Sequence, residues 1–172
     1  MFKYIYRDML SMVKFLPYGL VMGAVISVTL LWAAWRIRKL GGRTVEQLWP
    51  KSAFWTYLSV MLMITFLSRE SGSGQGMDLQ LFSTWGINDR NNAYVVENVL
   101  LFIPYGFLGA WVRGPMRRFF GCAFLGAATS LGIEFLQLVT KRGFFQVDDI
   151  LTNTLGTVIG YLLFRLLAWL GK

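Results

Sequence analysis

Carboxylates, amides and cations gather in a short polar interruption between two apolar stretches near the C-terminus. Residues 131–160 read LGIEFLQLVTKRGFFQVDDILTNTLGTVIG, with Glu134 and Gln137 before the interruption and Asn153 after it. An ionisable side chain inside an apolar span costs about 2.5–3.5 kcal/mol in a bilayer, which makes such residues candidates for function. Glu134 and Asp149 could act together as acid and base. No spacing among the acidic residues indicates a metal site, and no cofactor is predicted.

The cations beside these carboxylates have two interpretations. Arg142 is the nearest candidate partner of Glu134, with Lys141 and Arg90 as alternatives. A guanidinium can also bind a phosphate in bidentate fashion, which makes Arg142 a candidate ligand-binding residue. Asp148 directly precedes an apolar run, where an acid is typical of a helix N-cap. The residues therefore form either a structural ion-pair cluster or a site that faces a ligand.

The composition excludes several kinds of chemistry. The chain has no histidine, and its one cysteine, Cys122, lies in an apolar run, which excludes histidine catalysis, an internal disulfide and a thiolate metal cluster. There is no GxSxG element and no Gly-rich phosphate loop. The net charge of +8 comes from 17 basic and 9 acidic residues. Because the basic residues cluster between apolar runs, they indicate membrane topology and not nucleic-acid binding.

Transmembrane helices are the elements that would position the polar residues. With 55% hydrophobic residues, the 172-residue chain is predicted to be an all-α, polytopic transmembrane helical bundle with about five spans. The predicted spans cover residues 15–35, 53–68, 94–112, 119–140 and 150–170. Residues 1–52 form an N-terminal basic segment, the first span and a basic loop, and residues 53–172 form the membrane core. Residues 69–93, rich in Gly, Ser and Asn, are predicted to be a loop.

The first residues of the chain have two possible structures. Residues 2–14 form either an interfacial amphipathic helix or a frayed basic terminus. The apolar run that follows is too long for the apolar part of a signal peptide, so we interpret it as a retained span.

The distribution of basic residues predicts the orientation. One face of the membrane would hold Arg36, Arg38, Lys39, Arg43, Lys51, Arg113, Arg117, Arg118, Arg165 and Lys172. The opposite face would hold Lys3, Arg7, Lys14, Arg69, Arg90, Lys141 and Arg142. Because cytoplasmic loops carry the excess of Lys and Arg, the first face is predicted to be cytoplasmic. The N-terminus then lies outside the cell and the C-terminus inside.

Helical periodicity places the polar residues of three spans on one seam each. At 100° per residue, narrow stripes contain Asn98, Phe102, Tyr105 and Gly109; Gly126, Ser130, Glu134 and Gln137; and Asp149, Asn153, Gly156 and Gly160. Small residues allow close helix packing, and Pro104 is expected to kink its helix. Packing along the seams predicts a polar pocket open to the outer surface. Asn98 and Asn153 would line it or join the helices.

Three ordered motifs resemble those of VanZ-like membrane proteins. They are NVLLFIPYG at 98–106, which includes Pro104 and Gly106; EFLQ at 134–137; and VDDILTNTLG at 147–156, followed by Gly160. The resemblance covers about residues 77–165. It implies a bacterial inner-membrane protein that acts near cell-wall precursors and is associated with low-level resistance to teicoplanin-type lipoglycopeptides.

Three functional hypotheses remain open at this stage. In the first, the outer pocket binds or modulates a lipid-linked cell-wall precursor or the glycopeptide antibiotic. Arg142 and Arg90 would then contact an anionic group, and the ligand-binding residues would be Asn98, Glu134, Gln137, Arg142, Asp148, Asp149 and Asn153. In the second, the protein is an intramembrane enzyme with Glu134 and Asp149 as acid and base. In the third, the Gly-rich seam packs against another membrane protein or against a second copy in a homo-oligomer.

Overall fold

The fold is an all-α bundle, as predicted, with six helices among the described residues. The computed structural model describes residues 1–37, 43–67, 69, 72, 74, 76–112 and 114–171. The helices are α1 (Phe2–Met12), α2 (Leu16–Ile37), α3 (Arg43–Leu67), α4 (Asp89–Trp111), α5 (Phe119–Val139) and α6 (Val147–Leu170). Two short 3-10 helices, η1 (Val13–Phe15) and η2 (Pro115–Arg117), and two strands, β1 (Met77–Asp78) and β2 (Phe145–Gln146), complete the described part.

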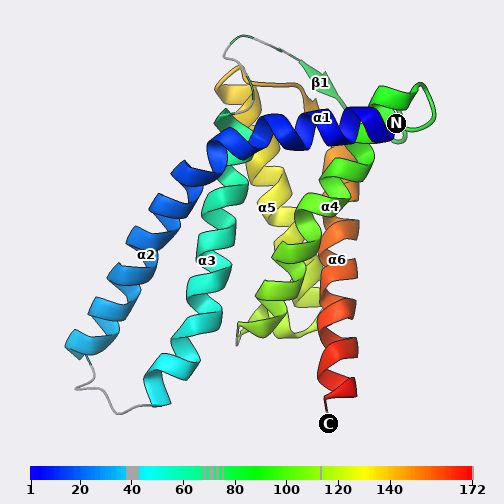
Figure 1. The fold of residues 1–172 in the computed structure, drawn as a ribbon. Helices are drawn as coiled ribbons and strands as arrows, with labels where there is room; N and C mark the ends of the chain where they lie inside the picture. Colours follow the sequence, from blue (N-terminus) through cyan, green and yellow to red (C-terminus); the bar gives the residue numbers. More distant parts are fainter. Residues whose placement is uncertain are drawn as a thin grey trace.

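Helices α2 to α6 run side by side, and α1 lies across one end of the bundle (Figure 1). This end, which we call the α1 end, also carries both strands, the starts of α4 and α6 and the ends of α3 and α5. Four described helical stretches are long and apolar enough to cross a membrane: Phe2–Ala33, Asp89–Trp111, Phe119–Val139 and Val147–Leu170. Since α3 runs beside α2 over the same depth, the bundle has about five spans.

Residues 2–12 form a helix, which is one of the two structures expected for them, and not a frayed terminus. The helix boundaries differ most from the predicted spans at α3. Helix α3 starts at Arg43, ten positions before the predicted span, and continues through Pro50. Hydropathy detects only the apolar part of a helix, so it missed this polar extension. Four of the basic residues used for the orientation lie outside the described residues: Arg38, Lys39, Arg113 and Lys172.

Helices α4 and α6 are in direct backbone contact through glycines. A Cβ atom at Gly156 or Gly160 would overlap a carbonyl oxygen of α4, that of Val99 or Ile103. A Cβ atom at Gly106 would overlap the carbonyl oxygen of Thr157 in the same way. The absence of side chains at these positions therefore sets the distance between the two helices.

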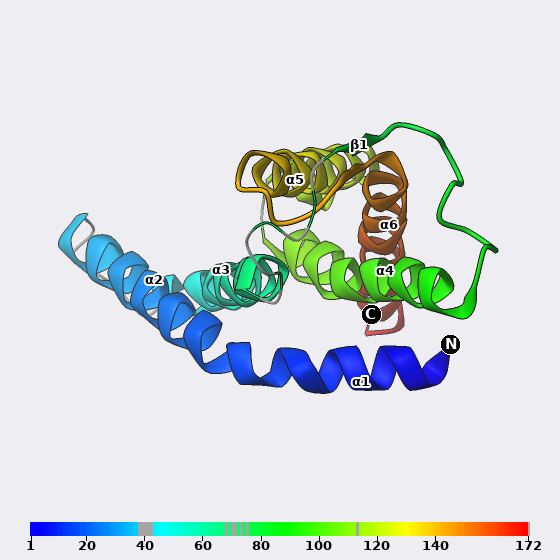
Figure 2. The same ribbon diagram turned by 90° about the horizontal axis from the view of Figure 1, so that it is seen from above.

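Helix α2 lies at the edge of the bundle and packs on α3 (Figure 2). Gly19 and Gly23 face the backbone of Val60 and Thr56, where a Cβ atom would come within 2.5 and 2.7 Å of an α carbon. Helices α3 and α4 meet at the far end through Trp49 and Trp111, whose rings are edge to face at 5.1 Å.

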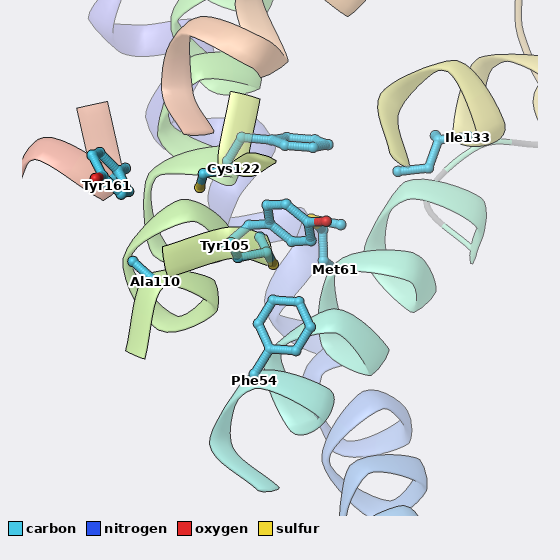
Figure 3. Packing of buried hydrophobic residues seen from close by; sticks show 9 residues of the cluster. Phe54, Met61, Tyr105, Ala110, Cys122, Ile133 and Tyr161 are labelled. Atoms are coloured by element: carbon cyan, nitrogen blue, oxygen red, sulfur yellow. The ribbon is translucent and has the colours of Figure 1, made fainter. Parts of the chain in front are cut away.

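The apolar core lies between α3, α4, α5 and α6. Phe54 and Met61 of α3 pack near Tyr105 of α4, and Cys122 of α5 lies close by (Figure 3). The Tyr105 hydroxyl is 2.8 Å from the Thr129 hydroxyl of α5. The core thus fixes the middle of the helices, while their polar ends meet at the α1 end.

Two short strands close the α1 end. Strands β1 and β2 are parallel, with Met77 opposite Phe145 and Asp78 opposite Gln146. An isolated bridge between Gly74 and Arg142 continues this pairing. The long connection between α3 and α4 is thereby attached to the short connection between α5 and α6.

Candidate functional site

The polar residues of α4, α5 and α6 converge at the α1 end, as the seams suggested. The polar side chains from α5 and α6 are turned inward and almost completely enclosed, whereas Asn98 of α4 is half-buried. Those with no more than 6% of their surface exposed are Ser130, Glu134, Gln137, Asp148, Asp149, Thr152 and Asn153. We use the term polar cluster for Ser130, Glu134, Gln137, Asp149 and Asn153.

Two carboxyl groups from different helices face each other in the polar cluster. Glu134 of α5 accepts a hydrogen bond at Oε2 from the backbone amide of Gln146, at 2.9 Å. The Asp149 carboxyl of α6 lies beside that of Glu134 and is approached by the Asn98 amide of α4. Burying two adjacent carboxylates is unfavourable unless a cation, a proton or several hydrogen-bond donors compensate.

Asn153 and Ser130 connect α6 to α5 next to this pair. Asn153 Nδ2 donates to Ser130 Oγ at 2.8 Å, and Ser130 Oγ donates to the Asp149 carbonyl oxygen at 3.5 Å. Gln137 Nε2 donates to the Thr65 carbonyl oxygen of α3 at 3.4 Å. Within the part of the chain that the structure describes, Asn153 Oδ1 and Gln137 Oε1 are buried without a donor. The polar cluster therefore has more acceptors than donors.

Arg142 does not pair with Glu134, contrary to the prediction. Its Nη1 atom donates to the carbonyl oxygens of Phe66 and Arg69, at 2.9 and 2.8 Å. The last carbonyls of a helix have no partner within that helix, and Arg142 provides one at the end of α3. Arg142 therefore attaches the connection between α5 and α6 to the end of α3.

The two alternative cations are also engaged elsewhere or exposed. Arg90 Nε donates to the Tyr94 hydroxyl at 2.7 Å, and its guanidinium lies over the Tyr4 ring of α1 and 3.9 Å from Asp8. Lys141 is exposed. A further cation, Arg69, lies just past the end of α3 and near both Glu134 and Asp149.

Sequence reasoning missed the role of Arg69. Its guanidinium packs against Gly143, where a Cβ atom would overlap Nη1. Arg69 is the first basic residue after an apolar span and lies on the predicted outer side, which was the available signal. Proximity along the chain favoured Arg142 instead, but α3 ends at the α1 end, which brings Arg69 near Glu134 although the two residues are 65 positions apart in the sequence.

Asp148 lies at the start of α6, as predicted, in the first turn and not at the N-cap position. The residue that caps α6 is Gln146, without a side-chain hydrogen bond. Its carboxylate accepts from the backbone amides of Phe82 and Thr84, at 2.6 and 2.9 Å. Asp148 therefore attaches the segment after β1 to α6.

The polar cluster is closed in this structure, whereas an outward-open pocket was predicted. Glu134, Gln137 and Asn153 are each at most 4% exposed. The connection between α5 and α6 contributes the Gln146 amide, and Gly143 in the same connection contacts Arg69. Convergence was predicted correctly from helical periodicity, but the covering segments could not be placed from it.

Comparison with known proteins identifies a family relationship over most of the membrane core. A family model described as VanZ/LLP1 matches residues 54–168. This range holds the polar cluster, Arg69 and the α4–α6 glycines, and it leaves out α1 and α2. No curated protein and no solved structure matches the chain.

Proposed function

The chain belongs to the VanZ/LLP1 family, and we propose that its polar cluster binds the hydroxyl- and amide-bearing part of a lipid-linked cell-wall precursor or of a teicoplanin-type antibiotic. The protein would thereby reduce susceptibility to these antibiotics. The observation that carries this proposal is a pair of buried amide oxygens without a donor among the described residues, Gln137 Oε1 and Asn153 Oδ1, which lie next to two carboxyl groups.

The chemistry of the cluster favours a donor-rich ligand over a phosphate. A buried acceptor without a donor costs about 1–3 kcal/mol, and a ligand hydroxyl or amide would recover that cost. Sugars and peptides offer such donors in quantity. Arg142 and Arg90, which were expected to hold a phosphate, contact Phe66 and Tyr94 instead. A phosphate would also meet the two carboxyl groups at short range.

We propose that the α1 end faces the outside of a bacterial inner membrane. The opposite end carries Arg36, Lys51, Arg117 and Arg118 in or near short connections, which is typical of a cytoplasmic face. Cell-wall precursors and glycopeptides meet on the outer face, so this orientation brings the polar cluster to the ligand's side. A ligand would enter when the α5–α6 connection, which holds Glu134 through the Gln146 amide, moves away.

One observation favours a second candidate, an intramembrane enzyme. Glu134 accepts a backbone hydrogen bond, whereas Asp149 lies beside an amide side chain, so the two carboxyl groups have different surroundings. Such a difference lets one group hold a proton while the other accepts one. No further nucleophile or cofactor is assigned, and binding therefore remains the main proposal.

Susceptibility to teicoplanin in cells that express variants at equal membrane levels tests the proposal. We expect wild type to protect and Asn153→Ala and Gln137→Ala to lose protection, because each removes an acceptor. Glu134→Gln keeps the shape and one acceptor oxygen but cannot ionise, so a binder should keep part of its protection and an enzyme should lose all of it. The matched control is Asp89→Asn, an exposed acid at the same end.

A direct binding assay distinguishes the two candidate ligands, the antibiotic and the cell-wall precursor. Purified protein in detergent is titrated with teicoplanin and, separately, with a lipid-linked cell-wall precursor. Saturable binding that Asn153→Ala weakens supports a site in the polar cluster. Protection that survives all cluster substitutions, or binding that none of them changes, contradicts it.

A further inference from the structure

An apolar groove of about 740 Å³ lies between the α2–α3 pair and α4, away from the polar cluster. It is lined by Leu20 and Leu31 of α2, Ala53, Thr56 and Val60 of α3, and Leu108 of α4. Leu16 and Leu31, both in the lining, are 15 positions apart, about 22 Å at 1.5 Å per residue. The groove is therefore long, and it runs with the membrane-spanning helices.

Three polar side chains of the groove walls have hydrogen-bond partners within the protein. The hydroxyls of Ser27 and Thr56 are 3.4 Å apart and bond to each other. The Tyr57 hydroxyl donates to the Leu101 carbonyl oxygen of α4, at 2.5 Å. The groove thus offers a hydrocarbon surface to its occupant. A ring pair, Trp49 and Trp111, lies at its far end.

Three exposed cations lie on α1 and η1, at the other end of the groove. Lys3 and Arg7 are four positions apart on one side of α1, and Lys14 follows in η1. The neighbouring face of α1 exposes apolar side chains, Phe2 and Met9 among them. An exposed amphipathic helix with cations along one edge, lying across the end of a bundle, is typical of a membrane surface rich in anionic lipid (Figure 1).

We propose that the groove holds a hydrocarbon chain of an anionic phospholipid whose phosphate contacts the basic edge of α1 and η1. Lys14 in η1 precedes Leu16, the first residue of the lining, by two positions, so cation and groove adjoin along the chain. The apolar groove would bind the hydrocarbon chain, and Lys14 would contact the phosphate. This inference does not depend on the proposed function, because the polar cluster contributes nothing to the groove.

A protein helix is a poor alternative occupant. A helix about 10 Å across and 22 Å long occupies about 1,700 Å³, more than twice the volume of the groove. A single extended hydrocarbon chain is narrow enough. The three cations further favour an occupant with a negative head group.

Native mass spectrometry of the detergent-purified full chain with added lipid tests the proposal. The probes are phosphatidylglycerol, phosphatidylcholine with the same acyl chains, and undecaprenyl phosphate. We expect phosphatidylglycerol to bind about fivefold more tightly than phosphatidylcholine, since one cation near a lipid surface contributes about 1 kcal/mol. Ala53→Phe should fill the groove and weaken both phospholipids, and Lys14→Glu should abolish the preference for phosphatidylglycerol.

Matched controls keep the test decisive. Ala128→Phe places the same ring on the exposed surface of α5, and Arg165→Glu reverses a charge on α6 outside the groove. Neither should alter lipid binding. Thermal unfolding in detergent confirms that Ala53→Phe is folded, and Thr56→Leu, which extends the lining more modestly, serves if it is not. Three results would each overturn the assignment. The first is equal binding of the two phospholipids, and the second is unchanged binding in both Ala53→Phe and Thr56→Leu. The third is much tighter binding of undecaprenyl phosphate than of phosphatidylglycerol.

Discussion

The Asp148 carboxylate accepts a hydrogen bond from the Thr84 backbone amide at 2.9 Å, across 64 positions of sequence. The amide of Phe82, a residue with a positive φ of 61°, donates to the other oxygen of the same carboxylate. A loop turn with two amides directed inward needs an anion, and Asp148 supplies it from the first turn of α6. The loop beyond β1 and the start of α6 therefore form one structural unit.

Replacing Asp148 should loosen this unit. Asp148→Asn replaces one carboxylate oxygen, a hydrogen-bond acceptor, with an NH₂ group that faces a backbone N–H donor. We therefore expect a loss of about 2 kcal/mol in the free energy of unfolding. Denaturant titration in detergent measures it. Asp89→Asn is the control: its carboxylate is 73% exposed and pairs with the N-terminus, so its loss should be at most about 1 kcal/mol. Equal effects of the two substitutions would contradict the structural role of Asp148.

The pH response of the same segment follows from Asp78. Its pKa lies below the ordinary value because the Ser83 hydroxyl and the Gln80 backbone amide donate to the charged carboxylate. A lowered pKa contributes stability above the ordinary value of 3.8, and this contribution is lost as the pH falls through the lowered pKa. Ser83→Ala should raise the pKa of Asp78 towards 3.8. A carboxyl NMR titration measures this change, and an unchanged pKa would contradict the contact.

Helical periodicity predicted which face of each helix is buried, but it could not predict the contacts that the connections between helices make. The stripe containing Gly126, Ser130 and Glu134 is buried in the structure, because residues at i, i+4 and i+8 of a helix share a face. The predicted pairing of Glu134 with Arg142 was wrong. The backbone donor to Glu134, Gln146, and the nearby cation Arg69 belong to connections whose course depends on the β1–β2 pairing. Two-residue strands leave no pattern in a sequence.

Arg142 stabilises the end of α3. Arg142→Lys keeps the charge but cannot reproduce the guanidinium contact to the carbonyls of both Phe66 and Arg69, so we expect a loss of about 1–3 kcal/mol in the free energy of unfolding. The control is Lys141→Gln, an exposed neighbour, for which the change should stay within about 0.5 kcal/mol. If Arg142→Lys is neutral, the contact to α3 carries no stability.

The glycines of α6 set the helix spacing. Gly160→Ala places a methyl group against the Ile103 carbonyl oxygen, so α4 and α6 must separate, and we expect a loss of about 1–3 kcal/mol. Gly132→Ala on α5 is the matched control, because nothing lies within 4 Å of its Cβ position. That change should stabilise the helix by up to about 1 kcal/mol. Thermal unfolding of both variants in detergent decides the matter, and similar shifts for the two would argue against close packing at Gly160.

Arg69 and Glu134 should be energetically coupled. Arg69→Gln removes a positive charge that lies near two buried carboxyl groups, so we expect a loss of stability. Glu134→Gln removes one of the two negative charges, so adding it to Arg69→Gln should recover part of that loss. We expect a coupling free energy of about 1–3 kcal/mol from the double-mutant cycle.

The control cycle pairs Arg90→Gln with Glu134→Gln. Arg90 contacts Tyr94 and the ring of Tyr4, so its effect should add to that of Glu134→Gln within about 0.5 kcal/mol. Additivity in the Arg69 cycle as well would mean that Glu134 is compensated by the Gln146 amide alone. Coupling confined to Arg69 would instead make the end of α3 part of the electrostatic environment in which a ligand meets the polar cluster.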